Sequence, residues 1–143
     1  MKIRSSAFKH NEPIPRRHTC QGEDISPELI IEEVPPGTDS LVLIMDDPDA
    51  PGKTFDHWIV YDIPVTDRIE EGAMPGTQGF NHFGKCNYGG PCPPSGTHRY
   101  FFKLYALDEM LSLPEGLGKG DVQNAMQGHI LDQAELIGLY QKS

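Results

Sequence analysis

Long apolar runs are missing from this sequence. The longest purely aliphatic stretch, Leu41 to Met45, is too short to cross a bilayer or to form the apolar part of a secretory signal. Basic residues are also scarce, with 12 Lys and Arg against 21 Asp and Glu, for a formal net charge of −9. Such a chain repels phosphate backbones and anionic lipids. We therefore expect a cytoplasmic protein with no nucleic-acid partner and no stable membrane insertion.

Cysteines are few, and their number is odd: Cys20, Cys86 and Cys92. In a chain without a secretory signal, this count is typical of reduced thiols rather than of a disulfide framework. A zinc site could use His82, Cys86, Cys92 and His98 as ligands. The gaps between them do not fit the tight paired spacing of structural zinc sites, so we expect no metal.

Several catalytic and cofactor motifs are absent as well. The sequence has no phosphate loop, no dinucleotide fingerprint and no G-x-S-x-G nucleophile elbow. We therefore assign no cofactor and no catalytic residue, and we expect a binding or inhibitory module rather than an enzyme. A Cys-His pair made of Cys92 with His57 or His98 is the alternative that would make it an enzyme.

What the chain does contain favours β-structure. Its 15 glycines and 13 prolines, about a fifth of 143 residues, interrupt long helices and exclude a helical bundle. Residues 72–96 form a Gly- and Pro-rich loop, and a loop of that length is usually functional. We expect one domain over residues 1–143, folded as a mainly β, two-sheet antiparallel sandwich with one main helix near the C-terminus. The expected strands are Leu29–Val34, Ser40–Met45, Asp56–Pro64, His98–Leu107 and Ala134–Tyr140, and the expected helix is Asp121–Gln133.

Three polar clusters could carry a function. Asp46, Asp47 and Asp49 follow a buried strand, and their mutual repulsion implies that a donor or cation holds at least one of them, although a plain polar turn is the alternative. His57 stands beside Asp56 and the only tryptophan. It is either a cap on the core or an imidazole held by a carboxylate, with its pKa raised.

The third cluster is the stretch from Tyr88 to Tyr100. Its glycines allow a ligand to approach backbone N–H groups, and its prolines keep the loop rigid before binding. His98 and Tyr100 share one face of the following strand because their spacing is two. Arg99 then points to the other face, where a structural salt bridge is its expected role.

Four motifs together resemble the signature of the phosphatidylethanolamine-binding protein family, over nearly the whole chain. They are Asp47-Pro48-Asp49-Ala50-Pro51, His57-Trp58, Gly90-Pro91 with Pro93-Pro94, and His98-Arg99-Tyr100. The length and the loop sequence are similar to the bacterial and archaeal branch, whose eukaryotic relatives include the Raf kinase inhibitor protein. The resemblance implies a preformed anion pocket lined by Asp47, His57, His98 and Tyr100. Asp49 and Pro94 would belong to its wall, and Gly90 to its rim.

The resemblance also implies ligands and partners. The expected ligand is a small phosphorylated or carboxylate anion, such as phosphate, phosphorylethanolamine or acetate. Inhibition of a serine protease or a kinase is the alternative, followed by hydrolysis through a pocket Cys or His. A homodimer is implied by the prokaryotic branch. We expect no counterpart of the C-terminal helix that eukaryotic members place near the pocket.

Overall fold

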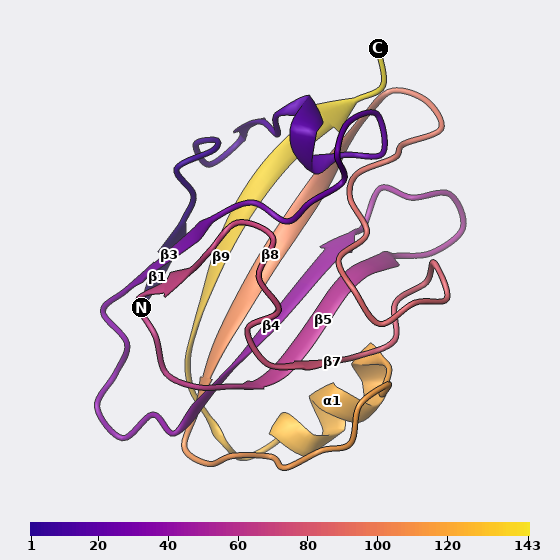
Figure 1. Ribbon diagram of the computed structural model, residues 1–143. Coiled ribbons are helices and arrows are strands. Elements are labelled where there is room, and N and C mark those ends of the chain that lie inside the picture. Colours follow the sequence, from indigo (N-terminus) through magenta and orange to yellow (C-terminus); the bar gives the residue numbers. More distant parts are fainter.

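Two facing β-sheets and one α-helix make up the protein, and the computed structural model describes residues 1–143 (Figure 1). The large sheet has the strand order β2-β9-β8-β4-β5-β7, and the small sheet has the order β1-β3-β6. The strands of the large sheet are β2 (Glu12–Pro13), β4 (Ser40–Asp47), β5 (Phe55–Ile63), β7 (Thr77–Gln78), β8 (Thr97–Leu107) and β9 (Ile130–Gln141). The remaining elements are β1 (Lys2–Arg4), β3 (Leu29–Glu32), β6 (Arg68–Ile69), a 3-10 turn η1 (Arg16–His18) and α1 (Lys119–Met126).

Strand β4 is buried over its whole length because both faces of the large sheet are covered. Leu41, Leu43 and Met45 point into the main core between the sheets. Val42 and Ile44 point the other way, into a smaller core that they share with Val122 and Met126 of α1 and with other apolar groups. A continuous aliphatic run is what a strand buried on both sides requires, so the expectation for Ser40–Met45 is confirmed.

The mainly β, two-sheet fold with one main helix near the C-terminus is confirmed, with two corrections. The helix ends at Met126, not at Gln133, because Gly128 adopts a positive φ of 82° and the chain turns directly into β9. One neighbouring pair is parallel: Glu12 and Pro13 of β2 lie beside Gly138 and Leu139 of β9, whereas every other pair is antiparallel.

The Gly- and Pro-rich stretch 72–96 contains only the two-residue strand β7, in agreement with its prediction as a loop. Beyond the pairing of β7 with β5, single backbone hydrogen bonds hold the stretch to the large sheet. The Gly79 N–H donates to the Ile59 carbonyl at 2.7 Å, and the His82 N–H donates to the Asp56 carbonyl at 3.0 Å. None of the helices has the length and apolarity that crossing a bilayer would require.

Candidate functional site

A cavity of about 310 Å³ lies where β4 ends, β5 begins and the loop before β8 closes over them. Five of the seven predicted site residues line it: Asp47, His57, Pro94, His98 and Tyr100. They meet because β4 lies between β5 and β8 in the sheet. The other lining residues are largely apolar: Ala50, Pro51, Phe55, Phe83, Cys92 and Pro93. A concave site with few polar groups on apolar walls is the usual form of a small-ligand site.

His98 is held by Asp47 on one side of the cavity. Its Nδ1 lies 2.7 Å from Asp47 Oδ2, and both side chains are buried. The other oxygen of Asp47 accepts the N–H of Asp49 at 2.8 Å. With Asp47 Oδ2 as the acceptor of this contact, the hydrogen is assigned to the Nδ1 of His98. No protein group binds its Nε2, which is the nitrogen left for a ligand.

His57 is oriented by backbone rather than by a carboxylate. Its Nδ1 donates to the Gly89 carbonyl at 2.7 Å, and the rings of Phe55, Phe83 and Tyr100 surround it at centroid distances of 5.0, 5.2 and 5.2 Å. Burial lowers the pKa of His57, against the opposing effect of the bond to Gly89. Of the two alternatives for His57, an imidazole held by a carboxylate with its pKa raised is therefore wrong.

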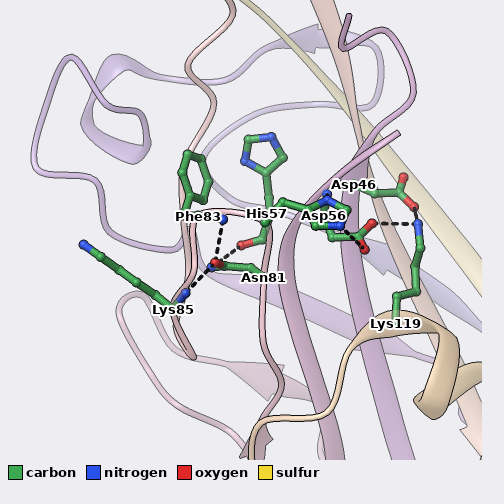
Figure 2. Close-up of polar contacts among 8 residues, drawn as sticks. Asp46, Asp56, His57, Asn81, Phe83, Lys85 and Lys119 are labelled. Atoms are coloured by element: carbon green, nitrogen blue, oxygen red, sulfur yellow. Dashed lines mark hydrogen bonds and ion pairs between the residues drawn. The ribbon is translucent and has the colours of Figure 1, made fainter. Parts of the chain in front are cut away.

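Asp56 lies on the opposite face of the sheet, because consecutive side chains in a strand alternate. Lys119 of α1 places its Nζ 2.7 Å from Asp56 Oδ1 and 3.1 Å from Asp46 Oδ2 (Figure 2). In Figure 2 the ring of His57 points away from this ion pair. Lys103 also lies 3.1 Å from Asp46 Oδ2. The expectation that a cation holds part of the acidic run is thus confirmed.

Tyr100 contributes a buried hydroxyl that has no hydrogen-bond partner within the protein. Burial, together with the nearby charge of Asp47, raises the pKa of Tyr100. The hydroxyl therefore stays protonated at any ordinary pH and remains available as a neutral donor. Because leaving a buried polar atom unpaired is costly, such an atom on a cavity wall indicates a ligand or a water as its partner.

Two predicted site residues, Asp49 and Gly90, do not line the cavity. The carboxylate of Asp49 accepts two bonds from the Arg99 guanidinium, at 2.8 and 2.9 Å, and one from the Arg99 N–H at 2.9 Å. Arg99 lowers the pKa of Asp49 to about 2, and the expected salt bridge of Arg99 is confirmed. Gly90 donates its N–H to Asp24 Oδ1 at 2.8 Å, behind the cavity wall.

The expectation of three reduced thiols is wrong, because Cys20 and Cys92 form a disulfide and only Cys86 is free. These two cysteines are 72 residues apart, and neither their number nor their spacing indicates that their loops meet. With its sulfur bonded, Cys92 is neither the nucleophile of a hydrolase nor a zinc ligand. No three His, Cys, Asp or Glu side chains gather as a metal site would require.

The loop 80–87 also shapes the cavity, through residues whose role the sequence does not predict. The Asn81 Oδ1 accepts the N–H groups of Phe83 and Lys85 at 3.0 and 3.1 Å, while its Nδ2 donates to the His57 carbonyl at 3.2 Å (Figure 2). Asn81 is fully buried, and through these bonds it fixes Phe83 beside His57. An asparagine in a Gly-rich stretch was the only available signal, and it equally describes any turn.

Comparison with known proteins gives consistent results. The sequence profile described as "Phosphatidylethanolamine-binding protein" matches residues 4–141. A UPF0098 protein of the bacterium Aquifex aeolicus is 52% identical, over 99% of this chain and 89% of the relative. A UPF0098 protein of the archaeon Methanothermobacter thermautotrophicus is 49% identical over 99% of both chains.

Two solved structures are also similar to this chain. The phosphatidylethanolamine-binding protein homologue CT736 of Chlamydia trachomatis superposes with a TM-score of 0.96 and 44% identity, over 99% of this chain and 97% of that one. YbcL of Escherichia coli, described as a new member of the mammalian PEBP family, superposes with a TM-score of 0.91 and 29% identity, over 99% and 98% of the two chains.

Proposed function

Since the chain belongs to the phosphatidylethanolamine-binding protein family, we propose that its cavity binds small phosphorylated or carboxylate anions, such as phosphate and the phosphorylethanolamine head group. The observation that carries the proposal is the buried Tyr100 hydroxyl, which lines the cavity without a partner in the protein. An anionic oxygen would accept its hydrogen bond. His57 and His98 line the same cavity, so one ligand can engage all three side chains.

How the two histidines can bind an anion depends on which of their ring nitrogens carry a hydrogen. Each already uses its Nδ1–H, His57 toward the Gly89 carbonyl and His98 toward Asp47. In the neutral form each Nε2 is therefore an acceptor, which repels a fully ionised oxygen. Binding requires a proton, either on an imidazole or on the phosphate itself, whose second pKa is near 6. We expect the affinity to rise as the pH falls from about 8 to 6.

Asp47 supports this arrangement without touching the anion through its own oxygens, since they accept the His98 Nδ1–H and the Asp49 N–H. Its contact with Nδ1 fixes the His98 ring so that Nε2 is left for the anion. The apolar walls exclude water and strengthen each charged hydrogen bond. Together these features suit an anion of a few heavy atoms better than an extended polyanion.

The proposal is tested by following the histidine ring resonances in NMR while phosphate, phosphorylethanolamine or acetate is added. We expect the resonances of His57 and His98 to shift and their pKa values to rise, whereas those of His10 and His129 stay unchanged. His57→Gln and His98→Gln assign the signals, and His129→Gln, far from the cavity, is the matched control. If no anion moves the His57 and His98 resonances, the proposal is wrong.

Three expectations from the sequence stay predictions. Inhibition of a serine protease or kinase is measured by the loss of a target enzyme's activity with increasing protein. Hydrolysis by a pocket histidine is measured by turnover of an aryl ester or phosphate. Formation of a homodimer is measured by sedimentation of the purified protein. Location in the cytoplasm is measured by cell fractionation.

A further inference from the structure

The wall of the cavity is bonded covalently to a segment of the chain that is distant in sequence. The segment 16–24, which includes η1, packs against the loop 88–94, which precedes β8. The Cys20–Cys92 disulfide joins them. Three hydrogen bonds accompany it: Cys20 N–H to the Pro91 carbonyl (3.1 Å), the Tyr88 hydroxyl to the His18 carbonyl (2.7 Å), and Gly90 N–H to Asp24 Oδ1 (2.8 Å).

The loop 88–94 also determines the shape of the cavity. Its Gly89 carbonyl accepts the bond that orients His57, and its residues Cys92, Pro93 and Pro94 line the cavity directly. Only the disulfide joins this loop covalently to segment 16–24. Breaking it would leave the position of the loop to the three hydrogen bonds and to the packing of its prolines.

The disulfide is open to reagents from the outside. A second hollow of about 230 Å³, which we call the outer hollow, is lined by both Cys20 and Cys92. Cys20 is exposed and Cys92 is half-buried. The exposed residue Lys85 lines the outer hollow too, and a positive charge attracts an incoming thiolate and stabilises a leaving one. Cys92 and Phe83 line both the outer hollow and the cavity.

We propose that the Cys20–Cys92 disulfide is a thiol–disulfide exchange site for small dithiols, and that its reduction weakens anion binding in the cavity. The second half of this inference rests on the proposed function. No other bond in the chain couples an accessible redox group so directly to the wall of the cavity.

The exchange proceeds in two balanced steps. A thiolate of the dithiol attacks the Sγ of Cys20, which is the exposed residue of the pair; the S–S bond breaks, and Cys92 leaves as a thiolate that takes up a proton. The second thiolate of the dithiol then attacks the dithiol's own sulfur in the mixed disulfide and forms the S–S bond of the oxidised dithiol, and Cys20 leaves as a thiolate that takes up the second proton. The protein disulfide gains two electrons and two protons, and the dithiol is oxidised to its own disulfide.

Reduction weakens binding for two reasons. The freed loop 88–94 must be ordered again when an anion binds, and the Gly89 carbonyl no longer holds His57 as firmly. The released Cys92 thiol also stays in the cavity wall, where its S–H is a weak donor that the disulfide does not have. We expect the affinity to fall about tenfold, within the usual range of coupling between sites. By linkage, a saturating anion then lowers the midpoint potential of the disulfide by about 30 mV.

The test uses the full chain carrying Cys86→Ser, so that the disulfide is the only redox group. Phosphate binding is measured calorimetrically for the oxidised form, for the form reduced with dithiothreitol, and for Cys20→Ser, which cannot form the bond. Alkylation followed by mass analysis measures how fast the native protein is reduced. NMR spectra of each form show whether it is folded, and the reduced protein serves where Cys20→Ser does not fold.

Weaker phosphate binding in the folded, reduced protein, restored by reoxidation, supports the inference. Equal affinity in the two redox forms overturns it and leaves the proposed function intact. A disulfide that dithiothreitol reduces only after unfolding overturns it as well. Absence of phosphate binding in both forms overturns the proposed function together with the coupling.

Discussion

Asp56 and His57 are consecutive in β5, yet they belong to two separate polar systems on opposite faces of the large sheet. Asp56 is paired with Lys119 of α1 at 2.7 Å, whereas His57 donates to the Gly89 carbonyl and faces the cavity. The same division separates Asp46, which is bound to Lys103 and Lys119, from Asp47, which is bound to His98. The two systems can therefore be altered one at a time.

Lys119→Met should destabilise the fold by about 3 kcal/mol, since it leaves two buried carboxylates without their shared cation. Burial alone would lower the pKa of Lys119, but the carboxylates of Asp56 and Asp46 outweigh it and raise that pKa. Urea denaturation measures the change, with Lys53→Met on an exposed loop as the control. Equal stability of the two variants would show that Lys103 and solvent compensate for the loss.

The stability of the anion-free protein should fall as the pH drops below 6.5, the ordinary pKa of a histidine. Burial lowers the pKa of folded His57, so the unfolded chain binds a proton there that the folded chain does not. The stability that this neutral, buried His57 contributes is present above pH 6.5 and is lost as the pH falls, with a slope of at most about 1.4 kcal/mol per pH unit.

The measurement is the difference between the wild-type protein and His57→Gln in thermal or urea unfolding between pH 8 and 5. That difference isolates one titrating group from all others. Adding phosphate should reduce the pH dependence of this stability difference, because a bound anion stabilises the protonated ring. Parallel pH profiles for the two proteins would refute this assignment of His57.

Gly90→Ala should destabilise the protein by about 1–3 kcal/mol and weaken phosphate binding, although Gly90 does not line the cavity. A Cβ at this position would clash with both the His18 carbonyl oxygen and Asp24 Oδ1. The segment 16–24 and the loop 88–94 must then move apart. Gly120→Ala, whose Cβ would meet nothing within 4 Å, is the matched control. A wild-type phosphate affinity in Gly90→Ala would show that the cavity does not depend on this packing.

Asp49→Asn should change phosphate affinity by less than ~2-fold, because Asp49 is directed to the largely exposed Arg99 outside the cavity. His98→Gln should lower the affinity by about tenfold or more, since it removes a charged donor to the anion. Calorimetric titration of both variants at pH 6.5 makes the comparison. A large loss of phosphate affinity in Asp49→Asn would show that Asp49 contacts the ligand, as the family resemblance implies.

The elements with a strong local pattern were predictable from the sequence. The aliphatic run of β4 and the aromatic-rich β8 require burial wherever they lie, and the spacing of His98 and Tyr100 places both on one face. Five of the seven site residues that the family resemblance implies line the cavity, and the strand spacing by itself accounts for only the shared face of His98 and Tyr100. The helix boundary was less certain, because the positions after Met126 still continue a helical periodicity.

Long-range contacts were not predictable in the same way. The pairing of Cys20 with Cys92, the approach of Lys119 to Asp56 and the bond of His57 to Gly89 join residues whose neighbours in sequence give no sign of them. The alternative in which a carboxylate holds His57 is wrong for the adjacent Asp56, because alternation along a strand separates the two side chains. Each of these contacts depends on how loops pack against one another, and the loops have no hydrophobic periodicity from which their packing could be predicted.

The parallel pairing of β2 with β9 has a consequence for how the chain folds during synthesis. Strand β9 lies between β2 and β8 in the large sheet, and it provides the register partners of both. While residues 130–141 are still in the ribosomal tunnel, the segment around β2 has no strand to join, and one side of β8 remains an open edge. Nascent chains arrested before residue 130 should therefore be cut readily by protease within their first 20 residues, whereas chains released at full length should resist.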